Sequence, residues 1–581
     1  MLIFRLFSVL TLVLLNGCAG SPAKQDTLEE SVSPVKVTQA KEKKPQDQDK
    51  SAIDPNVLYL LLTAELAGQR GQYDVALEGY MEAARLAKDP RFAERAAKIA
   101  MYMKDSSKTG DAVSLWLKQD PNNITARKIA ALSALRAGDK AAAIEHLKTL
   151  LTVDPAGFET ALLELASVLE KEGKTALVYD VLDALSLQKP DQAVVYFVQS
   201  LLAMQMKNKE LAEAKIAQAL KVQPDWDKAL VLQAQIAVYA GDLAKAKNLL
   251  TNAAVKHPGN DKIKKLLAQV LIKAADYEQA VNVYQEIISA NPQDAESQFA
   301  LALVHLQLEQ DGKAEDLLNK LLERPEWQYQ ASFYLGKIEE KRGNVEKALD
   351  WFDKVNDGAF VFEASISSVS LLAKNKQFEE ANSRLRLLLE QFPKHKLRLI
   401  LMQAELFSQQ KQYEKAFALL SDALLEMPEQ KELLYSHALM AERIGRLDVL
   451  EADLKKILAK RPDDAEALNA LGYSLLQKAD RYADAEKYLQ QAIRLKPDEA
   501  VIMDSYGWLQ FKLGNYEQAL VYLQQAYAKQ QETEIAAHLA EVLWVLGRKT
   551  EAKKLFNEAI KKAPEDEYLL DFQQRILNGG E

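Results

Sequence analysis

The sequence has 581 residues, of which 48% are hydrophobic and 27% charged, and its net charge is -9. This composition is typical of a folded chain, and 22 glycines and 17 prolines exclude collagen-like and low-complexity classes. The acidic balance argues against nucleic acid as the main partner. The single cysteine, Cys18, excludes a disulfide framework within one chain. Six scattered histidines, none in an HExxH pattern, are expected to be exposed or to satisfy buried hydrogen bonds.

Residues 1–17 predict a signal peptide. Arg5 precedes a run of apolar or small residues from Leu6 to Leu15. Ten residues span only ~15 Å as a helix, half of a bilayer core, so the run predicts a signal h-region rather than a transmembrane helix. The run ends at Leu15-Asn16-Gly17-Cys18, which resembles the lipobox of bacterial lipoproteins, with Asn16 as a departure. The resemblance implies that Cys18 is lipidated. An ordinary secretory signal with a chance cysteine is the alternative.

Residues 18–55 predict a flexible linker behind that cysteine. They are rich in Lys, Glu, Gln, Ser, Asp and Pro and contain no aromatic residue, so they bury too little apolar surface to order themselves. A tether of about 36 residues reaches on the order of 30–35 Å. Ala19 follows Cys18, where Asp would suggest retention in the inner membrane. Resemblance to Gram-negative lipoproteins therefore implies a lipid anchor in the outer membrane, with the folded body facing the periplasm.

Residues 56–566 predict a repeat array. Prolines recur every 33 to 35 residues, or at twice that interval, from Pro121 to Pro564. A period of 34 with a closing proline resembles the tetratricopeptide repeat, a helix–turn–helix unit. The resemblance covers some 510 residues, and 510/34 gives about 15 units. It implies an all-α superhelical solenoid, because each unit must stack on its neighbours to bury its apolar face.

The pattern inside the repeat supports this interpretation. In Asp227–Asn260, small or turn-forming residues stand at positions 8, 15, 20 and 32: Ala234, Gly241, Ala246 and Pro258. Positions 8 and 20 are expected where the two helices cross, position 15 at the turn, and the proline where the second helix stops.

Two parts of the array depart from the regular repeat. Near 91–123, Ala97 and Ala112 are 15 residues apart instead of 12, which predicts a kink or a break between two sub-arrays. Residues 567–581 predict a C-terminal capping helix that ends at Gly579-Gly580.

No catalytic motif is recognisable, so we expect no enzyme, cofactor or metal site. In tetratricopeptide arrays the first helices line a concave groove, mainly through positions 2, 5, 9 and 12. Ten regular units before residue 431 hold three aromatics at positions 5, 9 and 12: Phe197, Phe299 and Phe333. The last four units hold five, which form the candidate partner-binding groove: Tyr435, Tyr473, Trp508, Phe511 and Trp544. Tighter packing beside the cap is the alternative explanation.

The start of the array carries a further resemblance. Within Asp54–Ala100, the run AELAGQRGQYDVAL…DPRFAERAAKIA is similar to long outer-membrane tetratricopeptide lipoproteins of gamma-type proteobacteria. The resemblance implies an adaptor that binds and activates a periplasmic carboxyl-terminal processing serine protease and presents cell-wall endopeptidases to it. Two rivals stay open, a scaffold for exopolysaccharide export and an activator of a peptidoglycan synthase.

Overall fold

The computed structural model describes residues 54–578, and this part of the chain forms helices and contains no β-strand. The predicted signal peptide, Cys18 and nearly all of the predicted linker lie outside the described residues, as do residues 579–581. The chain divides into two compact units, one ending at Leu321 and one beginning at Leu322. Each unit is described by itself.

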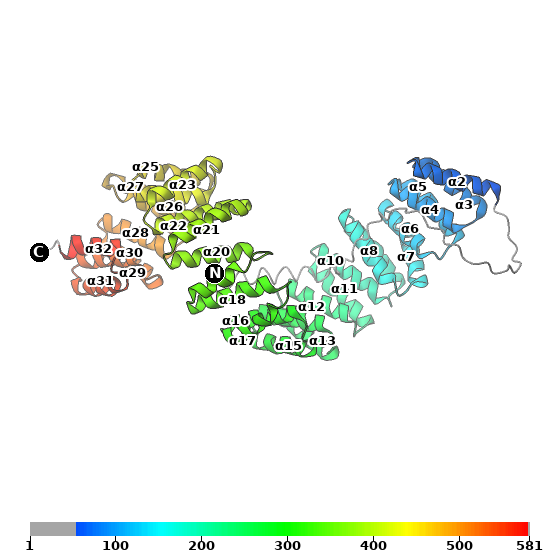
Figure 1. Ribbon diagram of the computed structural model, residues 1–581, viewed down its shortest axis with the longest axis horizontal. Helices are drawn as coiled ribbons and strands as arrows, with labels where there is room; N and C mark the ends of the chain where they lie inside the picture. The colour runs from blue at the N-terminus through cyan, green and yellow to red at the C-terminus, as the bar shows by residue number, and fades with distance from the viewer. Residues whose placement is uncertain (1–53, 579–581) are drawn as a thin grey trace. The chain divides into compact units, whose positions relative to one another are not determined.

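The N-terminal unit consists of helices that follow one another after short turns (Figure 1). They are α2 (Pro55–Gln69), α3 (Tyr73–Ala87), α4 (Pro90–Tyr102), α5 (Ser106–Gln119), α6 (Ile124–Ala137), α7 (Lys140–Val153), α8 (Phe158–Lys171), α9 (Thr175–Gln188), α10 (Ala193–Gln205), α11 (Lys209–Val222), α12 (Asp227–Tyr239), α13 (Leu243–Lys256), α14 (Asp261–Lys273), α15 (Tyr277–Ala290), α16 (Ala295–Gln307) and α17 (Asp311–Leu321).

The C-terminal unit continues the same alternation and ends in a short helix and a π-helical turn. Its elements are α18 (Gln328–Arg342), α19 (Val345–Asp353), α20 (Val361–Lys374), α21 (Phe378–Gln391), η1 (Pro393–His395), α22 (Lys396–Gln409), α23 (Tyr413–Glu426), α24 (Lys431–Arg443), α25 (Leu447–Lys460), α26 (Ala465–Leu475), η2 (Ala479–Arg481), α27 (Tyr482–Leu495), α28 (Ala500–Lys512), α29 (Tyr516–Lys529), α30 (Thr533–Val545), α31 (Lys549–Lys562), α32 (Glu567–Phe572) and η3 (Gln573–Leu577).

The helices α2 to α31 form fifteen pairs, which confirms the predicted all-α repeat solenoid. Within each unit, a helix packs against its partner in the pair and against the next pair. First helices of neighbouring repeats also touch, as α12 and α14 do, and α28 and α30. The apolar core therefore runs along each unit instead of gathering at one centre.

Small residues lie where the helices of a pair cross, as the repeat pattern predicts. Ala234 and Ala246 are fully buried. A Cβ atom added to Gly472 would lie 2.6 Å from Leu489 Cγ, so no larger side chain fits without movement. In another pair, the Ser200 hydroxyl donates a 2.8 Å hydrogen bond to the Ala212 carbonyl across the crossing.

The turn at position 15 adopts the left-handed conformation whether or not glycine occupies it. Gly241 has φ of 83°, and the equivalent Lys207 and Ala275 have φ of 59° and 57°. The fold therefore imposes this backbone geometry, and glycine only lowers its cost.

The unit near 91–123 shows how the repeat accommodates its unusual spacing. Thr109, not Ala112, lies twelve residues after Ala97, and it is buried. Its hydroxyl donates a 2.7 Å hydrogen bond to the Asp105 carbonyl, within the turn that begins α5. Helix α5 packs against both α4 and α6.

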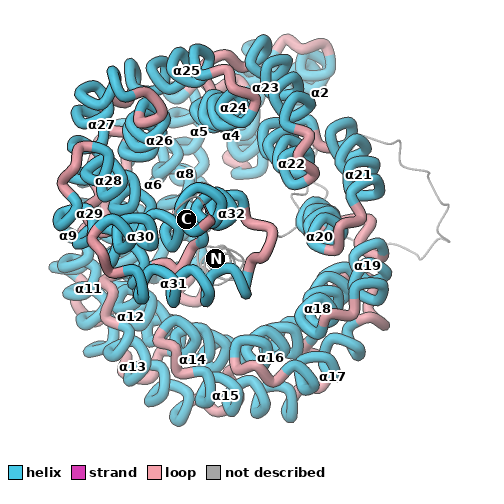
Figure 2. Tube along the Cα trace, turned by 90° about the vertical axis from the view of Figure 1, so that its left-hand side faces the viewer, coloured by secondary structure: helices cyan, strands magenta, loops and turns pink. Residues whose placement is uncertain are grey.

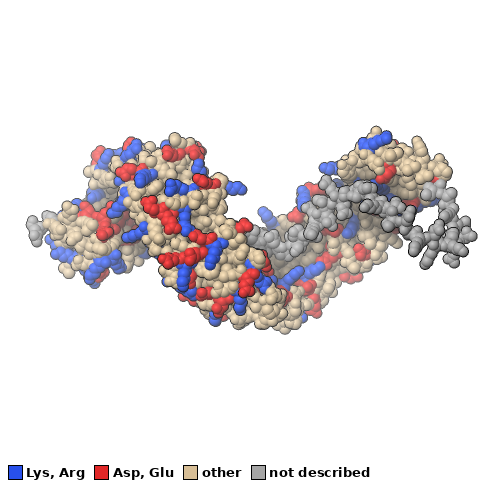
Figure 3. Space-filling view, viewed as in Figure 1, with Lys and Arg blue, Asp and Glu red and all other residues tan. Residues whose placement is uncertain are grey.

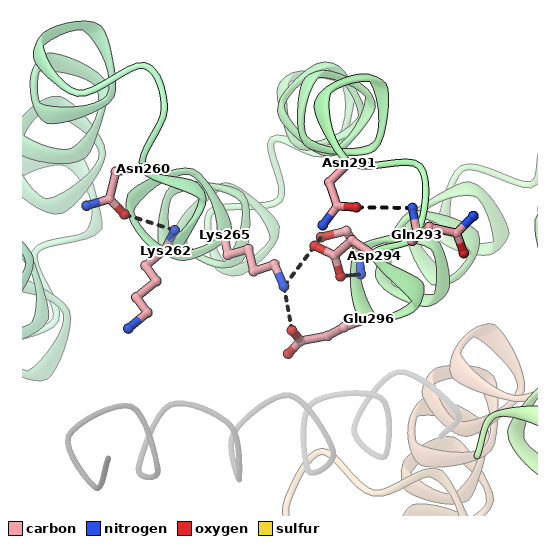
Figure 4. Close-up of polar contacts among 8 residues, drawn as sticks. Asn260, Lys262, Lys265, Asn291, Gln293, Asp294 and Glu296 are labelled. Carbon is pink, nitrogen blue, oxygen red and sulfur yellow. Dashed lines mark hydrogen bonds and ion pairs between the residues drawn. The ribbon is translucent and has the colours of Figure 1, made fainter. Parts of the chain in front are cut away.

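Ion pairs connect neighbouring repeats at the helix starts. Lys265 on α14 contacts Asp294 and Glu296 at the start of α16, with Nζ–O distances of 2.9 and 2.6 Å (Figure 4). Asp294 also accepts a 3.1 Å hydrogen bond from the Ser297 amide, so one carboxylate both caps α16 and links it to the preceding repeat. Lys431 repeats the arrangement with Asp464 and Glu466.

Across residues 54–578, no helix is long and apolar enough to cross a membrane.

Candidate protein-interaction surface

The five aromatic residues predicted as a groove lie on the first helices of the last four repeats. Tyr435 is on α24, Tyr473 on α26, Trp508 and Phe511 on α28, and Trp544 on α30. The fold encloses Trp508, which is only 8% exposed, while the other four are half-buried.

Trp508 is enclosed because it stacks on rings from its own and the next repeat. Its ring lies 4.0 Å from the His538 ring at an interplanar angle of 16°, and 4.7 Å from the Phe511 ring at 12°. His538 is on α30 and is buried. The Trp508 side chain therefore holds α28 and α30 together and presents little surface to a partner.

A buried polar cluster surrounds His538. The Tyr473 hydroxyl donates a 2.6 Å hydrogen bond to Glu534 Oε1 and lies 3.4 Å from His538 Nε2. His538 Nδ1 lies 3.0 Å from Asp504 Oδ1. We call these residues, with Trp508, the His538 cluster. It joins α26, α28 and α30 through groups that are satisfied by one another.

Burial and charge shift the titration of this cluster in definite directions. Burial alone would lower the pKa of His538, but the neighbouring carboxylates, Asp504 first, raise it above the ordinary value. Burial raises the pKa of Glu534, and Asp504 adds to that rise. Burial also raises the pKa of Tyr473, so its hydroxyl stays protonated and keeps donating to Glu534.

The last helix folds back onto the inner side of the C-terminal unit. Figure 2 shows α32 beside α30, inside the curve followed by α20 to α28. Arg443 on α24 forms an ion pair with Glu567 on α32, a contact between residues 124 positions apart. We call this contact the Arg443–Glu567 clasp. The neighbouring Tyr568 ring lies 6.5 Å from His538, so α32 covers the His538 cluster.

Phe511 and Trp544 remain accessible beside lysines. Lys512 Nζ lies 4.5 Å from the Trp508 ring and 5.8 Å from the Phe511 ring, and Lys549 Nζ and Lys553 Nζ lie 4.9 and 5.7 Å from the Trp544 ring. Both aromatic side chains pack on the same apolar cluster between α28 and α31. We call Phe511, Lys512, Trp544, Lys549 and Lys553 the aromatic–lysine edge. On the face drawn in Figure 3, acidic and basic side chains of the C-terminal unit are intermingled.

A second buried histidine, His437, contacts a serine and an aspartate, as in the Ser-His-Asp triad of hydrolases, but the surroundings do not form an active site. His437 Nδ1 lies 2.5 Å from Asp453 Oδ2, and His437 Nε2 lies 2.8 Å from the Ser421 hydroxyl. Ser421 sits inside α23 and also donates to the Phe417 carbonyl, so the hydroxyl is engaged by the helix itself. The backbone N–H groups around it belong to the same helix and offer no oxyanion site. The contacts of His437 therefore join α23, α24 and α25.

Within the described residues, no group of three or more acidic, His or Cys side chains could hold a metal ion.

Comparison with known proteins decides the family. Two family models, both described as tetratricopeptide repeat, match residues 237–304, 271–326 and 510–576, and residues 313–358 and 435–500. The TPR repeat-containing protein PA4667 of Pseudomonas aeruginosa is 31% identical over 533 residues, which cover 91% of this chain and 89% of that protein. The chain is a tetratricopeptide-repeat protein. Such repeats serve as protein–protein interaction scaffolds, and no catalytic family is indicated.

Solved tetratricopeptide structures align with parts of this tetratricopeptide-repeat protein. The protein TTC0263 of Thermus thermophilus is 26% identical, with 31% of this chain and 95% of that chain covered and a TM-score of 0.28. The Naa15/Naa10 complex bound to HypK-THB is 13% identical, with 90% and 99% covered and a TM-score of 0.33. Superpositions this loose carry no inference about function.

The site of this tetratricopeptide-repeat protein combines predicted and unpredicted residues. Tyr473, Trp508 and Phe511 come together, and Trp544 packs on the same core as Phe511. Tyr435 packs on the apolar cluster that also contacts Tyr473 and Phe511. Asp504, Glu534, His538 and the Arg443–Glu567 clasp escaped the sequence reasoning. One signal existed, since Asp504 and His538 are 34 residues apart, one repeat length.

Proposed function

We propose that this chain is a non-catalytic adaptor, anchored in the outer membrane through Cys18, that binds and activates a periplasmic carboxyl-terminal processing serine protease. In this proposal it also presents cell-wall endopeptidases to the protease for degradation. The run within Asp54–Ala100 supports the proposal, because it resembles the outer-membrane lipoproteins of the LbcA type. The array itself supports the coarser role of an interaction scaffold.

A tethered scaffold can act without chemistry of its own. Holding a protease and its substrate on one chain raises their effective concentration, which accelerates cleavage even when each separate contact is weak. The protease supplies the nucleophile, and the adaptor supplies position.

The observation that carries the partner-binding part of the proposal is the aromatic–lysine edge. Its aromatic rings, Phe511 and Trp544, are half-buried, and its lysines lie over the faces of these rings. Aromatic side chains that are already fixed by packing lose little freedom when a partner covers them, which makes them favoured anchors. The lysines favour an acidic partner segment.

The proposal is tested by affinity capture of the full chain from cross-linked membranes, read by mass spectrometry. Recovery of a carboxyl-terminal processing protease together with cell-wall endopeptidases is the expected result. Recovery of an export barrel or a peptidoglycan synthase without the protease would favour a scaffold for exopolysaccharide export or a synthase activator instead. A second assay measures the purified protease on an endopeptidase substrate with and without the chain, and an unchanged rate rejects the activating role.

A further inference from the structure

Helix α2 exposes an apolar stripe at the start of the N-terminal unit. Leu58, Tyr59, Leu62 and Leu66 are 45%, 70%, 57% and 51% exposed. The spacing of three and four residues places them on one face of the helix. The buried residues of the same helix, Val57, Ala64 and Ala67, face the core. Helix α2 therefore has one apolar face that packs and another that does not.

The position of α2 explains why this face is uncovered. In the described chain α2 has no preceding repeat, whereas first helices such as α14 contact the first helix of the repeat before them. The end of a repeat array normally carries polar residues on its outer face, because nothing stacks there. Three leucines and a tyrosine at this position indicate that something other than water covers α2.

The preceding segment of the chain and a second copy both fit this face poorly. Residues 19–53 contain no aromatic residue and few large aliphatic ones, so they cannot supply the apolar surface of a missing repeat. Four side chains about half exposed offer on the order of 300–400 Å², since even an aromatic side chain buries about 150–250 Å². A stable dimer needs about 800 Å² from each partner.

We propose that the α2 stripe lies against the phospholipid surface of the membrane that holds the anchor. The inference rests on the proposed lipidation of Cys18, which lies about 36 residues before α2 and within a tether length on the order of 30–35 Å. A patch too small for a free dimer suffices here, because an anchored chain meets the membrane as an intramolecular event. Tyr59, the most exposed of the four, has the apolar ring and polar hydroxyl that suit a membrane interface.

The test places a photoreactive aromatic residue in the stripe. The full chain carrying Tyr59→p-benzoylphenylalanine is reconstituted into vesicles of phosphatidylethanolamine and phosphatidylglycerol, irradiated, and digested for mass spectrometry. The expected result is a phospholipid adduct on the peptide that contains residue 59. The matched control carries the same substitution at Tyr239, which is 57% exposed at the end of α12, and is expected to stay free of lipid.

A second variant tests whether the leucines hold the helix at the lipid. Leu58→Ser with Leu62→Ser, in the photoreactive background, is expected to lower the adduct yield by about tenfold or more, because two large apolar side chains leave the lipid. Both leucines are exposed, so the fold is retained, and circular dichroism checks this. A cross-linked dimer without lipid, the absence of a lipid adduct at residue 59, or equal labelling at residues 59 and 239 overturns the inference.

The mass of the N-terminal peptide shows whether Cys18 is lipidated, and so distinguishes failure of the proposed membrane contact from failure of the proposed anchor. Acyl chains on Cys18 without lipid labelling at residue 59 reject the membrane contact and leave the anchor standing. Lipid labelling at residue 59 with an unmodified Cys18 rejects the anchor and supports the contact.

Discussion

At the scale of single residues, the C-terminal unit is distinctive for the charge that it buries. Asp504, Glu534 and His538 lie between helices that elsewhere pack through alanine and leucine. The stability of the fold around such a cluster falls when one member is removed, because the remaining charged groups stay buried without their partner. Its protonation therefore affects how firmly the last repeats hold together.

The proton on His538 is expected to stabilise the fold around α30. Because Asp504 and other carboxylates raise the pKa of His538 against the effect of burial, the protonated form favours the folded state. This contribution is complete below the unfolded pKa of about 6.5 and is lost as pH rises through the folded value. His538→Gln should destabilise α30 by about 3 kcal/mol at pH 6 and by less at pH 9.

Hydrogen exchange of α30 peptides, corrected for the intrinsic rate at each pH, measures this effect. His395→Gln serves as the control, because His395 is exposed in the short turn η1. An equal loss of protection in the His538 variant at both pH values would contradict the prediction.

Glu534 is expected to behave in the opposite way when its charge is removed. Burial raises the pKa of Glu534, so the ionised carboxylate is less favourable in the folded than in the unfolded chain. Glu534→Gln should increase the stability of α30 by about 1 kcal/mol at pH 8, since the amide oxygen still accepts from Tyr473. At pH 4, below the unfolded pKa of about 4.3, the two proteins should converge.

The same exchange experiment at pH 8 and pH 4 checks this prediction. Glu558→Gln, on the exposed side of α31, is the matched control and should leave the exchange protection of α30 unchanged at both pH values. A destabilised Glu534 variant at pH 8 would show that the carboxylate is needed in its ionised form.

At the scale of helices, the distance between the two members of a pair decides which residues the repeat tolerates. Gly472 of α26 has no room for a Cβ atom against Leu489 of α27, whereas a Cβ atom at Gly110 of α5 would meet nothing within 4 Å. The two glycines therefore have different roles, although both lie inside helices.

Replacing each of these glycines with alanine should give effects of opposite sign. Gly472→Ala should destabilise the C-terminal unit by about 1–3 kcal/mol, because α26 and α27 must separate. Gly110→Ala should stabilise the N-terminal unit by about 0.5–1 kcal/mol, because alanine favours the helix and meets no obstacle. Urea unfolding compares the two variants with the parent chain. A stabilising Gly472 variant would show that Leu489 moves aside freely.

The sequence predicted the helical pairs well because their determinants are local and periodic. A 34-residue repeat with small residues at fixed positions specifies a pair of helices wherever it occurs, as the close approach at Gly472 and the burial of Ala234 show. The left-handed turn at Lys207 was invisible to a pattern that looked for glycine.

The candidate site was predicted only in part, because its determinants are long-range. The positions of the aromatic residues on first helices followed from the repeat, but the burial of Trp508 depends on a stacking partner one repeat later, His538. The cover over that cluster depends on α32 returning to Arg443, and no periodic pattern specifies this. The binding role of Tyr435, Tyr473, Trp508, Phe511 and Trp544 stays a prediction.

At the scale of the whole molecule, the chain is a protein-interaction scaffold whose proposed clients should depend on accessible residues. Trp544→Ala with Lys549→Ala should lower the capture of the proposed protease by about thirtyfold or more, since a packed aromatic anchor contributes about 2 kcal/mol or more. Trp544 is half-buried on α30 and Lys549 is exposed on α31, and circular dichroism checks that the array of the variant stays folded.

Binding of the purified protease to the immobilised chain measures this loss. The control replaces Tyr239 with Ala, an exposed aromatic residue of the N-terminal unit. Unchanged binding in the double variant would exclude the aromatic–lysine edge as the contact surface. Trp508→Ala is unsuitable for this purpose, because loss of the buried ring disrupts the packing between α28 and α30.

The Arg443–Glu567 clasp also has a mechanical consequence. A solenoid pulled from a free end unravels one repeat after another, because each repeat touches only its neighbours. In the C-terminal unit, α32 is attached both to α30 and, through the clasp, to α24. Force applied at the C-terminus must therefore detach α32 from α30 and break the clasp before the last repeats can extend, so extension should begin with the release of α32 and then proceed repeat by repeat.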